Sequence, residues 1–87
     1  MHAVVVKVTI KDEEPSLQEL REKVVPQVAQ APGFVAGYWT RSGNSGVSMI
    51  VFESEDAANA ASERVPSTIP EAVTLEDVEV REVVAHA

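Results

Sequence analysis

The segment from Ala31 to Gly46 constrains the fold of this chain more than any other stretch of its sequence. Pro32-Gly33 ends an apolar helical pattern, and the aromatic and β-branched residues of Phe34–Ser42 then predict a strand. Gly43-Asn44-Ser45-Gly46 has the composition of a tight reversal with positive φ angles. The segment therefore predicts a helix that stops and a strand that enters a hairpin.

The second strand of this hairpin is expected over Val47–Glu53. With Asn44-Ser45 at the tip of the turn, the register places Trp39 opposite Ile50. Successive residues of a strand point to opposite faces of the sheet. Tyr38 and Trp39 are therefore expected on opposite faces, so at most one of them shares a cavity with the helices.

The first strand and the first helix are predicted by two different periods. Apolar residues alternate over Val4–Ile10, which predicts a strand with one wholly apolar face. Ser16 and Glu19 have the spacing of a capping box that opens a helix, and Pro26 is expected to kink or shorten its last turn. The apolar face of this helix consists of Leu17, Leu20, Val24 and Val28.

The C-terminal half predicts one more helix and one more strand. Ser54 is the expected N-cap, and the acidic pair Glu55-Asp56 suits the positive end of a helix dipole. This helix is expected to end at Pro66, and Val73–Val84 forms a final strand. The order is β-α-β-β-α-β over one domain, residues 1–87.

This order predicts an α+β, ferredoxin-like fold. Right-handed crossovers place both helices on one face of a four-stranded antiparallel sheet and leave the other face bare. If the apolar side of Val4–Ile10 faces the helices, we expect the bare face to carry Val5, Val35, Trp39, Ile50, Phe52 and Val83. Such a patch is too large for a monomer, so we expect a homodimer that pairs its sheets.

Composition narrows the class of protein. An 87-residue chain buries only a little more than about 60% of its unfolded surface, so a partner subunit would help it. The net charge of −7 repels phosphate backbones and argues against nucleic-acid binding. No apolar run approaches the length of a membrane span, and the N-terminus lacks the pattern of a secretory signal, so we expect a cytoplasmic protein without a membrane segment. No cysteine is present to form a disulfide or a catalytic thiolate.

In its element order and in three short segments, the chain resembles the dimeric α/β-barrel superfamily, and within it the small antibiotic-biosynthesis-monooxygenase-like domains. The matching features are the element order and the segments Ala31-Pro32-Gly33-Phe34, Gly37-Tyr38-Trp39-Thr40-Arg41 and Val51-Phe52-Glu53-Ser54-Glu55-Asp56-Ala57. The resemblance implies a homodimer whose sheets form a barrel, with a pocket between each sheet and its helices. It also implies oxygenation of a substrate without a cofactor, although the second helix, Asp56–Arg64, lacks the His and Trp that oxygenases of this family commonly use.

Four residues are candidates for ligand binding. Trp39 offers a stacking surface and one N–H donor, or is simply core or interface. Tyr38 offers a phenol, or is a half-buried strand residue. Arg41 suits a carboxylate or an enolate-like anion, or pairs with Glu79 or an acid of a partner subunit. Asn59 is the one polar residue of the second helix that can be offered for binding.

The remaining motifs assign no chemistry. His2 and His86 lie at the chain ends, beside strands expected to be neighbours, where they could form a metal-binding or proton-transfer pair, but chain ends fray and two His alone make an incomplete metal site. The glycines do not form a phosphate-binding fingerprint, so no cofactor and no metal is expected, and no catalytic residue is assigned. Two functions stay open: binding of a small apolar or aromatic molecule, with or without cofactor-independent oxygenation, and a non-catalytic carrier or interaction module.

Overall fold

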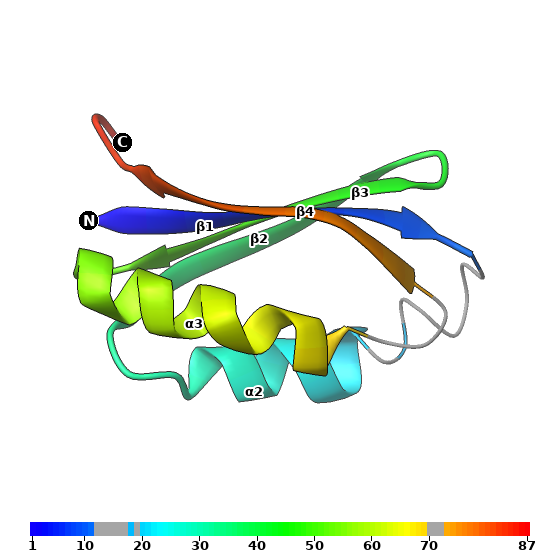
Figure 1. The fold of residues 1–87 in the computed structure, drawn as a ribbon, viewed down its shortest axis with the longest axis horizontal. Helices are drawn as coiled ribbons and strands as arrows, with labels where there is room; N and C mark the ends of the chain where they lie inside the picture. The colour runs from blue at the N-terminus through cyan, green and yellow to red at the C-terminus, as the bar shows by residue number, and fades with distance from the viewer. Residues whose placement is uncertain (12–17, 19, 70–72) are drawn as a thin grey trace.

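A computed structural model describes residues 1–11, 18, 20–69 and 73–87 of the protein. The strands β1 (His2–Ile10), β2 (Phe34–Ser42), β3 (Ser45–Phe52) and β4 (Val73–Glu82) form one antiparallel sheet in the order β2-β3-β1-β4. The helical elements are η1 (Leu20–Val24), α2 (Val25–Ala29) and α3 (Glu55–Thr68). Figure 1 shows α2 and α3 on the same side of the sheet. This α+β architecture is compatible with the predicted ferredoxin-like fold.

Cross-strand rows define the two faces of the sheet. On the face toward the helices, Ile50 lies opposite both Gly37 and Val4, and Val4 lies opposite Val80. The buried core cluster is on this face and consists of Val4, Val6, Ile50, Phe52 and Ala58. The alternation of β1 therefore turns its apolar side to the helices, which is the condition on which the expected composition of the bare face depended.

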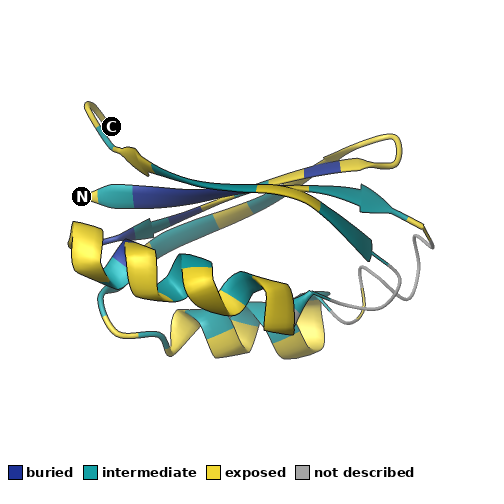
Figure 2. Cartoon of the chain, in the orientation of Figure 1, coloured by how far each residue is buried: buried dark blue, intermediate teal, exposed yellow. Residues whose placement is uncertain are grey.

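The expected placement of Trp39, Ile50 and Phe52 on the bare face is wrong. Because Val4 lies opposite Ile50, the apolar side of β1 and the side of β3 that carries Ile50 and Phe52 share the helix face, and Trp39 packs against the same core. The side chains on the bare face, which we call the open face, include Val5, Lys7, Thr40, Tyr38, Val47 and Met49. Figure 2 shows the buried positions concentrated in β1 and β3.

The hairpin turns one residue earlier than predicted. Ser42 lies opposite Ser45, so the tip is Gly43-Asn44 rather than Asn44-Ser45, and Trp39 lies opposite Ser48 rather than Ile50. Gly43 has φ of 60°, whereas no residue other than glycine has a positive φ in the described chain. A positive φ at the first turn residue alone is the pattern of a type II′ turn, which favours glycine there. The two-residue change in register leaves every side chain on the same face of the hairpin.

Both helical segments accommodate a proline. The predicted capping residues Ser16 and Glu19 lie outside the described residues. The π-helical turn η1 runs directly into α2, so Pro26 lies inside one helical segment that continues to Ala29, and its missing amide leaves one carbonyl of the preceding turn without a helical partner. The expected end of the second helix at Pro66 is wrong, because α3 continues to Thr68. So close to the helix end, this proline removes one backbone hydrogen bond and leaves the preceding turns intact.

Gly33 joins the first helical segment to β2 and lies close to α3. A substitution at Gly33 therefore tests how tightly the two pack. It has φ of +79°, and a Cβ built there would lie 2.9 Å from Cβ of Ala57. We expect Gly33→Ala to lower the free energy of unfolding by about 2 to 4 kcal/mol, since a left-handed conformation and a close contact add together. Urea denaturation measures this loss.

Gly43→Ala is the matched control for Gly33→Ala. Gly43 also has a positive φ, but a Cβ built there meets nothing within 4 Å. Its expected loss is about 1 to 2 kcal/mol from backbone conformation alone. Equal losses for the two variants would contradict the predicted contact between Gly33 and α3.

Candidate functional site

A cavity of about 120 Å³ lies between the sheet and the helical layer, and we call it the Trp39 cavity. Its floor is built by the helix face of the sheet, including Val6, Val8 and Ile50. Leu20, Val24, Val28 and Val65 contribute from the helical side. Three of these four belong to the apolar face predicted for the first helix, so that face of the helix lines the cavity.

Two glycines shape the floor of the Trp39 cavity. A Cβ built at Gly37 would lie 2.8 Å from Cη2 of Trp39, so the indole lies over a strand position without a side chain. A Cβ built at Gly46 would lie 2.7 Å from Cγ2 of Val8. Both glycines are on the helix face, and the space that their side chains would fill is taken by Trp39 and Val8.

Polar groups are few around the Trp39 cavity. In the described part of its lining they are restricted to Thr40, Arg41 and Ser48. The side chain of Thr40 belongs to the open face, where its hydroxyl donates to the carbonyl oxygen of Val47 at 2.6 Å, so only Arg41 and Ser48 have side chains on the face of the cavity, and Ser48 lies opposite Trp39. Such a lining suits an apolar molecule with at most one or two polar atoms.

A second cavity of about 220 Å³ adjoins the first, and we call it the Phe52 cavity. The two share the lining residues Val28, Ile50 and Val65. Behind it, the Phe52 ring meets Phe34 edge to face, with ring centroids 6.3 Å apart and an interplanar angle of 79°. The two cavities therefore lie side by side and meet at Val28, Ile50 and Val65.

The structure separates the four candidate residues. Trp39 and Arg41 line the Trp39 cavity. Tyr38 lies on the open face with 65% of its surface exposed, which confirms that it does not share a cavity with Trp39. Asn59 is exposed on α3 and lines neither cavity, and its carbonyl oxygen accepts a hydrogen bond from Ser62.

Several cavity residues were missed by sequence reasoning. Ser48 shares the face of Trp39 by strand alternation alone, so its position could have been predicted once that face was known. Gln27, Gln30 and Arg64 line the Phe52 cavity, and only the packing of the helices brings them together. No spacing in the sequence joins these three.

Glu79 does not pair with Arg41, as was predicted, but with Arg81 on its own strand. Glu79 lies on β4, at the opposite edge of the sheet from β2, and its carboxylate meets Nε of Arg81 at 2.9 Å. The hydrogen bond to Glu79 and the charge of that carboxylate raise the pKa of Arg81. Glu79 lies opposite Val5, so this pair borders the open face.

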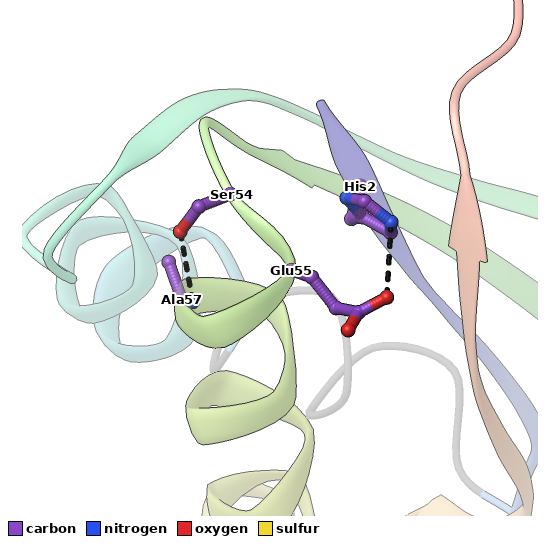
Figure 3. Close-up of polar contacts among 4 residues, drawn as sticks. All are labelled: His2, Ser54, Glu55 and Ala57. Carbon is purple, nitrogen blue, oxygen red and sulfur yellow. Dashed lines mark hydrogen bonds and ion pairs between the residues drawn. The ribbon is translucent and has the colours of Figure 1, made fainter.

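His2 has a different partner from the one considered above. Its Nε2 lies 3.3 Å from Oε2 of Glu55 in the first turn of α3, beside the cap in which Ser54 Oγ accepts from the Ala57 amide at 3.1 Å (Figure 3). Nδ1 of His2 is buried without a hydrogen-bond partner among the described residues. That part of the chain contains no group of three or more metal-binding side chains. The strands β1 and β4 are neighbours, as expected, while His86 lies beyond the end of β4.

Comparisons with known proteins add no assignment. No family model matches the chain, and a search of curated proteins found no match. Among the described residues, no helix has the length and apolar character needed to cross a membrane.

Proposed function

We propose that this protein binds a small apolar or aromatic molecule in the Trp39 cavity. The observation that carries the proposal is an apolar space between sheet and helices, bordered by one indole and few polar groups. In a protein core the side chains normally fill the interior and leave few voids larger than a water molecule. Here the helix face of the sheet and the apolar side chains of the helical layer enclose a space that no side chain fills.

The volume favours a ligand of one ring. The Trp39 cavity measures about 120 Å³. Engineered apolar cavities of about 150 Å³ stay dry and bind benzene, so a single aromatic ring is the appropriate size class. Ser48 and Arg41, at the same cavity, provide hydrogen-bonding groups for one polar substituent on that ring.

Binding without turnover is the favoured form of this function. The described lining of the Trp39 cavity contains no His, Cys, Asp or Glu to act as a general acid or base. The alternative is a cofactor-independent monooxygenase, as implied by the resemblance to antibiotic-biosynthesis-monooxygenase-like domains. Oxygen consumption with a hydroquinone substrate, abolished by Arg41→Ala, would favour that enzyme over a carrier.

We also propose that two copies pair through their open faces to form an α/β barrel. Tyr38, Met49 and Val47 are 65%, 45% and 39% exposed on this face. Tyr38, Met49 and Val5 form one cross-strand row, which Glu79 continues at the edge. Charged residues lie beside this row, Lys7 on the inner strand β1 and Glu79 on the edge strand β4, and protein interfaces combine an apolar core with such polar surroundings.

Toluene is the probe that tests the proposed cavity. We expect it to shift the methyl resonances of Val8, Val28 and Ile50 in NMR spectra and to leave Val84, which is 86% exposed, unchanged. Val65 lines both cavities, so the larger side chain of Val65→Phe should fill the space beside it and prevent these shifts.

Val84→Phe is the matched control for Val65→Phe, because it adds the same ring at an exposed position. It should leave toluene binding unchanged. Methyl shifts that are absent up to the solubility limit of toluene, or that persist in Val65→Phe, would contradict the proposed site.

A further inference from the structure

The Phe52 cavity has a buried floor and a polar rim. Val4, Ile50 and Phe52 are buried beneath it. Gln27, Gln30 and Arg64 line the same cavity but are exposed to solvent. An apolar interior with polar groups gathered at its opening differs from the Trp39 cavity and fits a ligand with two chemically different ends.

We propose that the Phe52 cavity binds the carboxylate end of an amphiphilic monocarboxylate, a molecule with one anionic head and an unbranched apolar tail. The inference deepens the proposed function and rests on it, because the tail would occupy the interlayer space assigned to apolar ligands. Arg64 binds the head, and the floor formed by Ile50 and its neighbours receives the tail.

Arg64 is suited to bind an anion by its position on α3. Residues three and four positions away on a helix are its surface neighbours, and on the N-terminal side these are Ala60 and Ala61. No acidic side chain forms an ion pair with Arg64 in the part of the chain that the structure describes. Its planar guanidinium can hold both oxygens of a carboxylate, and the small alanines leave the approach to the cavity open.

The positive charge of Arg64 and the amides beside it favour an anionic head group at the rim. Gln27 and Gln30 each carry an amide that can donate to the same carboxylate. The net charge of −7 repels an anion at long range, but this repulsion is largely screened beyond about 8 Å at physiological ionic strength. The local contact with Arg64 therefore determines the binding of the head.

The neighbouring position of the two cavities favours an unbranched tail. Val28, Ile50 and Val65 line both cavities, so a tail bound beside Arg64 would extend over Ile50 toward the Trp39 cavity. From Arg64 to Ile69, just past the helix end, the chain advances roughly 7.5 Å at 1.5 Å per residue. A medium-length chain fits this path, whereas acetate would leave it empty.

Titrations with octanoate and octan-1-ol at 150 mM salt, followed by calorimetry, test the proposal. Octanoate should bind the wild-type protein, and acetate should not. Arg64→Gln should weaken octanoate binding at least about tenfold, because a charge-assisted hydrogen bond is lost. The same variant should change octan-1-ol binding less than about twofold. Arg81→Gln removes the same charge from the open face and should leave octanoate binding unchanged.

The outcomes separate this inference from the proposed function. Equal affinities for octanoate in wild type and Arg64→Gln, or an equal loss in Arg81→Gln, would overturn the role of Arg64 while toluene binding still supports the apolar cavity. Absence of binding by octanoate, octan-1-ol and toluene alike would overturn both proposals. The second measurement uses the wild-type protein and so does not depend on the folding of Arg64→Gln: the Nε resonance of Arg64 should shift with octanoate but not with octan-1-ol.

Discussion

Trp39→Ala and Tyr38→Ala are expected to damage two different properties of the protein. Trp39 packs against the core on the helix face, and its truncation should lower the free energy of unfolding by about 3 kcal/mol and change the affinity for toluene, because one wall of the Trp39 cavity is removed. Tyr38 is exposed on the open face, so its truncation should leave the cavity intact and weaken the proposed homodimer. Adjacent residues of one strand thus report on opposite faces of the sheet.

Three measurements separate these effects. Urea denaturation gives the stability, methyl NMR with toluene gives the cavity occupancy, and light scattering over a range of protein concentrations gives the oligomeric state. Asn59→Ala, an exposed position on α3 that lines neither cavity, is the control for both variants. A wild-type protein that remains about 9.4 kDa at high micromolar concentration would contradict the dimer, and a Tyr38→Ala variant that loses toluene binding would contradict the separation of the faces.

The sequence predicted the order of the strands and helices because their signals are local. The β2 boundaries, Phe34–Ser42, agree with the structure, since a helix-ending Pro32-Gly33 and a turn glycine bracket them. The cap at Ser54 is likewise a short-range interaction and is confirmed by its bond to the Ala57 amide. These features depend on residues that are at most a few positions apart.

The face that carries Trp39 could not be predicted in the same way. It depends on the register between β1 and β3, which are separated by a helical segment and another strand, and a shift of one residue reverses the face. The sequence offered two apolar sides, one on β1 and one on the hairpin, without showing that they join. In the structure Val4 pairs with Ile50, so the two sides form one core and the bare face receives Tyr38 and Met49 instead.

The sequence did not show which of the four candidate residues lie together. Trp39 and Arg41 line the Trp39 cavity, whereas Tyr38 and Asn59 do not. Alternation along a strand shows which of its residues share a face. Which helical residues lie against that face depends on how α2 and α3 pack on the sheet. For this reason Arg64, an ordinary charged helix residue in the sequence, gained a proposed role only from its place at the rim of the Phe52 cavity.

Phe52→Ala is expected to cause the largest loss of stability of any single truncation considered. Phe52 is 1% exposed, belongs to the core cluster and contacts Phe34 edge to face. Removing a buried phenylalanine ring costs about 3 to 5 kcal/mol, which is a large share of the roughly 5 to 15 kcal/mol that stabilises a small domain. Phe52→Leu retains most of the volume and should cost less than about 1.5 kcal/mol. Urea denaturation at two protein concentrations separates this loss from any change in dimerisation.

Added toluene distinguishes a lost ring from a misfolded chain in these variants. Phe52 lines the existing Phe52 cavity, so its truncation joins the vacated volume to space that is already present. A ligand that binds only the folded state raises stability by mass action, and the larger apolar space should bind toluene more tightly. We therefore expect toluene to restore more stability to Phe52→Ala than to Phe52→Leu or wild type. An equal gain in all three proteins would show that toluene binds elsewhere, and a loss of less than about 1 kcal/mol in Phe52→Ala would contradict the position of Phe52 in the core.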